Sequence, residues 1–175
     1  VVGVTGDRIT RVSGLGWGTD HAFLKKNPYN NPHWNQASLM KTDKGHMVRC
    51  NMFKLCAAGG ERAQWFGDKA SLYMPTEGVF DEAIQHDRMG ESRPVDLPET
   101  WKSESLPEPM RHPSGHGGSA VLISAEFINA LIEDREPEVD LYDSLAMTLP
   151  GIVAHQSAMK DGEQLPVPQF NRPTG

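Results

Sequence analysis

One histidine stands between glycines, directly before a stretch with helical periodicity, in the segment SGHGGSAVLI at residues 114–123. The glycines around His116 let the backbone approach a ligand closely, and the helix beyond would offer unpaired N–H donors at its first turn. A neutral imidazole there can hydrogen-bond a ligand or take up a proton near neutral pH. A glycine-rich helix entry whose histidine bonds a backbone carbonyl explains the same residues. The local pattern therefore leaves a functional and a structural role open for His116.

A second unusual stretch is NPYNNPHW, residues 27–34, in which two Asn-Pro pairs stiffen a loop. Tyr29, His33 and Trp34 combine aromatic faces with hydrogen-bonding groups. This combination suits a sugar or polyol, which presents hydroxyls together with apolar C–H faces. A rigid turn with Trp34 packed on a sheet edge accounts for the same residues, so both interpretations stand.

Other arrangements of reactive residues do not fit known chemistry. His112 and His116 have a spacing that would suit metal ligands on a helix, but Pro113 and the glycines beside His116 forbid a regular helix there. The run Gly14-x-Gly16-x-Gly18 lacks the following helix and the spacing of a dinucleotide-binding loop, and it predicts close packing or a bulge. No Gly-x-Ser-x-Gly nucleophile elbow is present.

Composition excludes further classes of function. The formal net charge of −6 provides no basic excess for phosphates or anionic lipids, so we expect neither nucleic acid nor a membrane as a partner. No apolar run approaches the roughly 20 residues that a membrane span needs. Cys50 and Cys56 fall in one predicted strand, too far apart to form a disulfide. Two buried, reduced thiols are expected, which suits a cytoplasmic protein.

The secondary-structure elements that position these residues are predicted to be strands in the first half of the sequence and helices in the second half. A strand is predicted at residues 8–17, and a β-hairpin turns at residues 43–45. In its second strand, one face is expected to be buried; it consists of Val48, Cys50, Met52 and Cys56. Another hairpin is predicted to turn at residues 67–69. Residues 75–115 are rich in proline and charge and are expected to form a long functional loop.

Two helices are predicted in the second half. The first is capped by Ser119 and runs to about Asp134. Its expected apolar stripe is Val121, Ala125, Ile128 and Ile132. The second is capped by Asp140, and its expected apolar side is Leu141, Leu145, Leu149 and Ile152. The sequence thus predicts one α+β domain over residues 1–175, with an open, predominantly antiparallel β-sheet and helices packed on one face.

Several segments in order resemble the carboxy-terminal half of Gfo/Idh/MocA-type oxidoreductases, the relatives of glucose-fructose oxidoreductase and inositol dehydrogenase. They are GDRITRVSGLGWG, NPYNNPHWNQASLMKTDKGHMVR, GHGGSAVLISAEFINALIEDREPEVDLYDSLAMTLPGIVAHQSA and LPVPQF. The resemblance implies an amino-terminal Rossmann domain that binds NAD or NADP and that this chain lacks. The family's glycine-rich nucleotide loop and its Glu-Lys-Pro lysine have no counterpart here, so the fragment alone is not expected to be catalytic and binds no cofactor by itself.

The resemblance also implies roles for individual residues. His116 is expected to contact the substrate, through a hydrogen bond to a hydroxyl or by assisting proton transfer. Tyr29, Asn31 and Trp34 are expected in the wall of the substrate pocket. We therefore expect a substrate-binding domain of an NAD(P)-dependent sugar or polyol oxidoreductase, which forms a homo-oligomer through its sheet face. Two alternatives remain open: a non-catalytic dimerisation or scaffold module, and a domain of an NAD-dependent glycosidase of the same family.

Overall fold

Two compact units make up the chain. The first contains residues 1–57 and 138–175, and the second contains residues 58–137. The structure is a computed structural model that describes residues 1–18, 20, 22–57, 60–76, 82–113 and 116–172. Each unit is described separately below. That residues 1–175 form a single domain stays a prediction.

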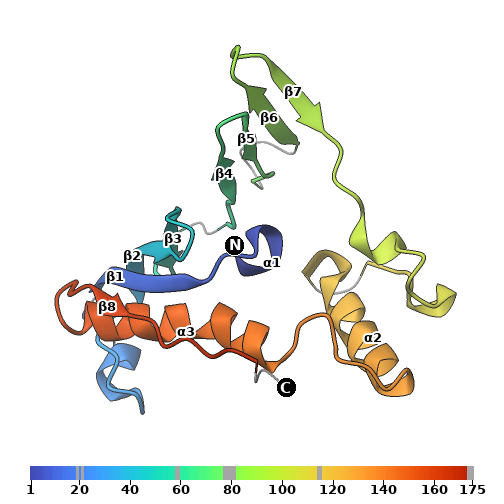
Figure 1. Ribbon diagram of the computed structural model, residues 1–175. Coiled ribbons are helices and arrows are strands. Elements are labelled where there is room, and N and C mark those ends of the chain that lie inside the picture. The colour runs from blue at the N-terminus through green and yellow to red at the C-terminus, as the bar shows by residue number, and fades with distance from the viewer. Residues whose placement is uncertain (19, 21, 58–59, 77–81, 114–115, 173–175) are drawn as a thin grey trace. The chain divides into compact units, whose positions relative to one another are not determined.

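The first unit is built on a four-stranded antiparallel sheet with the strand order β3-β2-β1-β8 (Figure 1). Its elements are α1 Val2–Thr5, β1 Ile9–Trp17, η1 Ala22–Lys26, β2 Asn35–Thr42, β3 Met47–Phe53, α3 Leu141–Ala158 and β8 Leu165–Pro166. β-Branched residues in β1 favour the extended backbone. The predicted β2–β3 hairpin is confirmed, and Gly45 has the positive φ of 87° that its turn requires.

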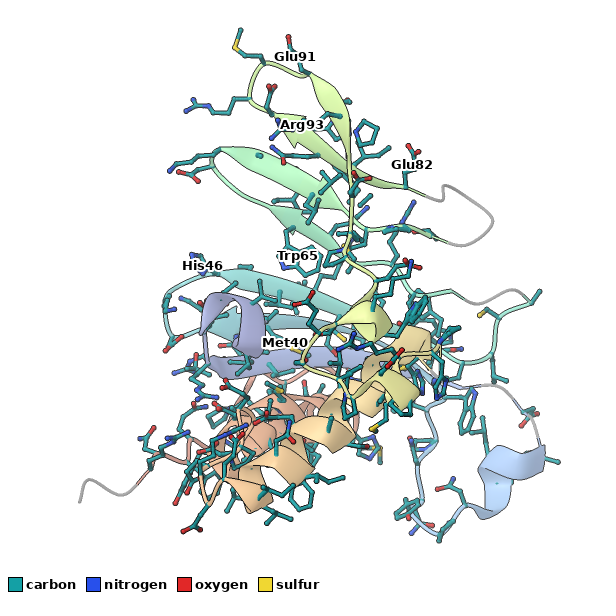
Figure 2. All side chains as sticks on the ribbon, turned by 90° about the vertical axis from the view of Figure 1, so that its right-hand side faces the viewer. Met40, His46, Trp65, Glu82, Glu91 and Arg93 are labelled. Atoms are coloured by element: carbon teal, nitrogen blue, oxygen red, sulfur yellow. The ribbon has the colours of Figure 1, made fainter. Side chains whose placement is uncertain are left out.

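Helix α3 covers one face of this sheet. Asp140 caps it as predicted, because its carboxylate accepts a hydrogen bond of 2.8 Å from the Asp143 backbone N–H. Val12 and Met40 pack against Val153 and Ala154 from the helix, and Figure 2 shows Met40 in this layer.

The predicted apolar side of α3 is wrong at both of its ends, although Leu149 packs against the core as predicted. Leu141 and Ile152 are 66% and 49% exposed, while the buried residues are Pro150, Val153, Ala154, Ser157 and Ala158. The buried face of α3 consists mainly of small residues because the helix lies very close to β1. A Cβ on Gly14 would stand 2.8 Å from the Ala154 carbonyl oxygen. Large leucines there would hold the helix away from the sheet.

The expected burial of β3 is also wrong. Val48 is partly buried and packs against the core, but Cys50 and Met52 are exposed. The strand ends at Phe53, so Cys56 lies beyond it and is exposed as well. β3 is the edge strand, two strands away from β1, along which α3 packs. A residue on the helix side of the sheet is therefore buried only where the helix reaches.

The second unit holds another four-stranded antiparallel sheet, with the order β4-β5-β6-β7. Its strands are β4 Gln64–Phe66, β5 Ala70–Tyr73, β6 Ala83–Asp87 and β7 Ser92–Val95. The predicted turn at residues 67–69 is confirmed. The prediction that residues 75–115 form a long loop is wrong in part, because β6 pairs with β5 and β7 pairs with β6. Pro94 argues against a strand at β7 when only the sequence is considered, but β7 lies at the edge of the sheet, where proline is tolerated. Within that range, 77–81 and 114–115 lie outside the described residues.

The rest of the second unit is helical. It contains the 3₁₀ turns η2 Thr100–Lys102, η3 Glu108–Met110 and η4 His116–Gly118, followed by α2 Ser119–Ile132. The predicted cap is wrong: Gly118 occupies the N-cap position, and the Ser119 hydroxyl donates to the His116 carbonyl oxygen. The predicted stripe is only partly correct: Ala125 is 6% exposed, whereas Ile128 and Ile132 are 50% and 76% exposed. α2 is apolar on nearly every side, so periodicity could not select the face that packs.

The predicted α+β class with open antiparallel sheets is confirmed by this architecture. No helix in the part of the chain that the structure describes is long and apolar enough to cross a membrane.

Candidate functional site

His116 occupies a strained position at the entrance to α2. Its φ is 57°, in the left-handed region that residues with a side chain rarely adopt, and it is exposed. The Ser119 hydroxyl donates a hydrogen bond of 2.9 Å to its carbonyl oxygen. Strained backbone of this kind persists where the surroundings impose it, and it occurs preferentially at functional sites. His116 therefore exposes its imidazole to solvent, on a turn whose backbone conformation is unfavourable for a residue with a side chain.

The 27–34 loop is organised by one side chain, that of Asn27. Its Nδ2 donates to the carbonyl oxygens of Leu24 and Asn31, both at 2.9 Å. Its Oδ1 accepts from the backbone N–H groups of Tyr29 at 3.2 Å and Asn31 at 2.9 Å. These four bonds hold the loop in one conformation, so its exposed groups are preorganised for binding.

A shallow hollow of about 200 Å³ opens in this loop. It is lined by Leu24, Lys25, Asn27, Asn30, Asn31 and Pro32. Of the three predicted pocket residues in the loop, only Asn31 is in this lining. Tyr29 is 84% exposed and Trp34 is 38% exposed. Amides and an ammonium group around a small hollow can hydrogen-bond the hydroxyls of a polyol.

The four predicted site residues fall in different units. Tyr29, Asn31 and Trp34 share one loop of the first unit, and His116 belongs to the second. The sequence prediction that all four act on one substrate remains a prediction.

The glycine run in β1 serves packing, as predicted. A Cβ on Gly14 would meet the Ala154 carbonyl, one on Gly16 would meet the His33 ring, and one on Gly18 would meet the Pro32 carbonyl. The space beside these glycines is thus filled by protein, and a cofactor pyrophosphate does not fit there.

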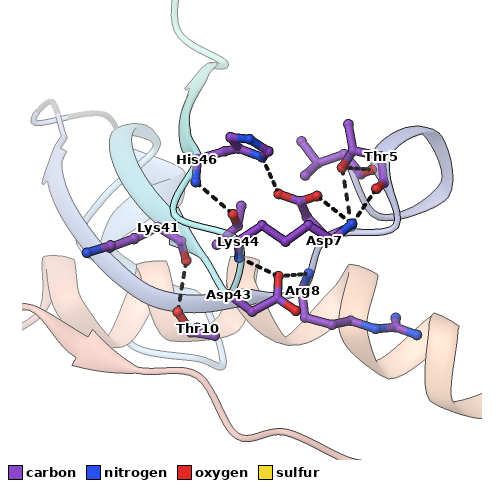
Figure 3. A network of polar contacts seen from close by, with 10 residues as sticks. Thr5, Asp7, Arg8, Thr10, Lys41, Asp43, Lys44 and His46 are labelled. Atoms are coloured by element: carbon purple, nitrogen blue, oxygen red, sulfur yellow. Dashed lines mark hydrogen bonds and ion pairs between the residues drawn. The ribbon is translucent and has the colours of Figure 1, made fainter.

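Sequence reasoning missed a polar network around Asp7, which is 1% exposed (Figure 3). Its carboxylate contacts His46 Nδ1 at 2.7 Å and Lys44 Nζ at 3.2 Å. A hydrogen bond from the Thr42 side chain lowers the pKa of Asp7 far below its usual range, and bonds from His46, Thr5 and Lys44 add to this against the opposing effect of burial. No sequence motif links Asp7 to the distant hairpin. Among the described residues, no group of three or more His, Cys, Asp or Glu is arranged to hold a metal.

Comparisons with known proteins agree with the sequence resemblance. Residues 94–174 match the family model described as glycosyl hydrolase 109, C-terminal domain. No curated protein sequence matches the chain. Among solved structures, levoglucosan dehydrogenase in complex with NADH superposes with a TM-score of 0.68 at 13% identity, over 93% of this chain and 46% of that one.

Two further structures show the same relationship. An oxidoreductase domain protein from Kribbella flavida gives a TM-score of 0.67 at 16% identity, over 94% of this chain and 46% of that chain. An inositol dehydrogenase homolog from Azotobacter vinelandii, complexed with NADH and myo-inositol, gives a TM-score of 0.59 at 15% identity, over 93% of this chain and 45% of that chain. The chain therefore has the same fold as part of these oxidoreductase structures. It spans less than half the length of these structures.

The two candidate regions differ in whether the matched family model covers them. The matched residues 94–174 include η2, the His116 turn, α2, α3 and β8. The 27–34 loop lies outside them. His116 therefore lies in the part of the domain that the family model covers, whereas Tyr29, Asn31 and Trp34 lie in the part covered by structural similarity alone.

Proposed function

We propose that this chain is the substrate-binding and oligomerisation domain of an NAD(P)-dependent sugar or polyol oxidoreductase. The full enzyme would transfer hydride between a substrate carbinol carbon and the nicotinamide. The similarity to dehydrogenase structures over 93% of the chain supports this assignment. The single observation that carries the site is His116, an exposed imidazole held in left-handed backbone geometry at the head of α2.

The role we assign to His116 is contact with a substrate hydroxyl, through a hydrogen bond or by assisting proton transfer. Asn31 provides amide groups at the edge of the loop hollow, and Tyr29 and Trp34 provide exposed aromatic surface for the apolar face of a sugar. NAD or NADP would be bound by an amino-terminal nucleotide-binding domain of the full-length enzyme. Consistent with this, Gly14, Gly16 and Gly18 in this chain are surrounded by other protein atoms.

The test uses the full-length enzyme with NAD and with NADP, assayed on a panel of sugars and polyols that includes levoglucosan and myo-inositol. We expect reduced nicotinamide to form with at least one substrate. His116→Ala should then lower kcat/KM by about 10²-fold or more, as for the loss of a proton-transfer group. The matched control is His112→Ala, an exposed histidine on the preceding segment. Equal turnover of the His116→Ala and wild-type enzymes would contradict the role of His116.

Oligomerisation is assigned to the sheet face opposite α3. Alternation along the strands places Leu15 and Trp17 of β1, Leu39 of β2 and Phe53 of β3 on that face. Their exposed fractions run from 45% to 56%, and the Trp17 and Phe53 rings lie 5.3 Å apart. A second copy of the chain is the occupant we propose for this apolar surface.

The oligomer is tested by light scattering on the full-length protein at micromolar concentration. Leu39→Glu should reduce the mass to that of one chain, because a carboxylate would be buried at the contact. Met89→Glu is the control, since Met89 is 87% exposed on the β6–β7 turn. A wild-type mass of one chain would contradict the proposal.

An NAD-dependent glycosidase is a second candidate, because the family model matched by residues 94–174 is described as that of a glycosyl hydrolase. That match covers less of the chain than the dehydrogenase structures do, so we place it second. Cleavage of an aryl glycoside that requires NAD but leaves no net NADH would favour it. A native protein that binds no nicotinamide cofactor would favour a non-catalytic scaffold module. The expected cytoplasmic location and the absence of nucleic-acid and membrane partners stay predictions.

A further inference from the structure

The turn that carries His116 is packed against the short 3₁₀ segment η2, which belongs to the range expected to be loop. The closest approach joins Gly118 to Trp101. A Cβ on Gly118 would stand 2.5 Å from the Trp101 Cβ and 3.2 Å from both the Cα and the Cγ of that residue. Real Cβ atoms essentially never make contacts as short as 2.5 Å, so Trp101 leaves no room at residue 118 for any side chain.

Gly118 is linked directly to the strained histidine. It has a φ of 90° and forms the N-cap of α2, two residues after His116. From the other side, the Ser119 hydroxyl bonds to the His116 carbonyl oxygen. The backbone from 116 to 119 is thus held between Trp101 and the first turn of α2. A left-handed histidine needs such an external restraint, because an unrestrained chain would relax it.

The η2 segment can act as a support because its own chain is tied down. Leu106, a few residues further on, is 1% exposed, and its N–H donates to the Ser103 carbonyl at 3.1 Å. The Arg111 guanidinium donates to the carbonyl oxygens of Leu106 at 2.8 Å and Glu104 at 3.1 Å. Trp101 itself is half-buried. These bonds restrain the chain that follows η2, and η2 contacts the turn.

We propose that Trp101 is a positioning residue for His116: its side chain packs against Gly118 and so holds the backbone geometry from which the imidazole meets the substrate. This rests on the proposed function of His116. The contact itself, from Trp101 through Gly118 to His116, is a property of the structure, so its effect on the imidazole can be measured separately from turnover.

The first measurement is independent of activity and uses the full-length enzyme with labelled histidine. Trp101→Ala and Gly118→Ala should shift the imidazole NMR resonances of His116. The matched control for Gly118→Ala is Gly90→Ala: Gly90 also has positive φ, 81°, but a Cβ there would meet nothing within 4 Å. Unchanged His116 resonances in folded Trp101→Ala and Gly118→Ala enzymes would overturn the proposal.

The second measurement is a double-mutant cycle on kcat/KM. If Trp101 acts through His116, Trp101→Ala should lower kcat/KM about tenfold or more in the wild-type enzyme and cause no further loss in His116→Ala. Trp101→Phe keeps an aromatic ring, which Trp101→Ala removes, and should restore most of the activity. Losses that add fully in the double variant would overturn the positioning role.

The two proposals fail in different ways. If His116→Ala has wild-type activity, the proposed function of His116 fails, while the NMR shift still decides whether Trp101 positions its ring. If Trp101→Ala does not fold, as judged by circular dichroism, the comparison of Gly118→Ala with Gly90→Ala decides the question instead. A loss of activity equal in these two glycine variants would overturn the proposal.

Discussion

Asp7 and His46 are 39 residues apart in the chain, yet His46 Nδ1 lies 2.7 Å from the Asp7 carboxylate. The contact ties the segment before β1 to the tip of the β2–β3 hairpin (Figure 3). Lys44 strengthens it, because its ammonium group lies 3.2 Å from Asp7 and donates to the Thr5 carbonyl at 2.8 Å. These partners favour the charged form of the buried carboxylate.

Asp7→Asn should lower the melting temperature at pH 7, since the amide cannot accept all the bonds that the carboxylate accepts. The hydrogen bonds led by Thr42 place the folded-state pKa of Asp7 below its value in the unfolded chain. Its stabilisation is therefore complete above the unfolded pKa, about 4, and is lost as the pH falls toward the folded pKa.

Melting curves from pH 7 down to pH 3 test this relationship. The difference in melting temperature between wild type and Asp7→Asn should shrink below about pH 4. Asp96→Asn, a change at an exposed carboxylate, should leave the melting temperature nearly unchanged. A difference for Asp7→Asn that stays constant over the whole pH range would contradict the assignment.

Two glycine-to-alanine changes should alter the free energy of unfolding in opposite directions. Gly14→Ala would place a Cβ 2.8 Å from the Ala154 carbonyl and 3.0 Å from the Ser38 hydroxyl, which should cost about 1–3 kcal/mol through overpacking between β1 and α3. Gly151→Ala, within α3, meets nothing within 4 Å. It should stabilise the helix by about 0.5–1 kcal/mol. Urea unfolding measures both, and equal signs would show that α3 does not approach β1 as described.

Ser157 connects α3 to strand β1 and to the chain that follows the helix. It is fully buried; its hydroxyl donates to the Glu163 carbonyl at 2.6 Å and accepts from the Gly14 N–H at 2.9 Å. Ser157→Ala leaves a buried donor and acceptor without a partner, which should cost about 1–3 kcal/mol in the free energy of unfolding. Ser144→Ala, an exposed change on the same helix, should change it by less than about 0.5 kcal/mol. Indistinguishable values would refute the role of the hydroxyl.

Leu106 is a fully buried side chain between η2 and η3 in the second unit. Leu106→Ala removes a side chain that is 1% exposed, and should cost about 2–5 kcal/mol. Hydrogen exchange should show faster exchange in the amides of α2, because η2 packs against α2. Leu131→Ala, at a residue 68% exposed on α2, is the control. Unchanged protection of α2 in Leu106→Ala would contradict this expectation.

The local features of the fold could be predicted from sequence. The hairpin at Gly45 and the cap at Asp140 each depend on a few adjacent residues whose backbone preferences all favour the same structure. The close packing of the β1 glycines could also be predicted, because their spacing did not fit a nucleotide loop. Strands β6 and β7 were missed because both are short, β7 contains Pro94, and their pairing with β5 and with each other is not visible in the local sequence.

The sequence by itself therefore determined the α+β class, the positions of the main turns and helix starts, and the family resemblance. The tertiary structure alone decided which face of α3 is buried, that β3 is exposed, and that Trp101 lies against Gly118. It also brought Asp7 to His46. These features depend on contacts between residues far apart in the chain, and such contacts are set by close packing and by the reach of each element rather than by local backbone preference.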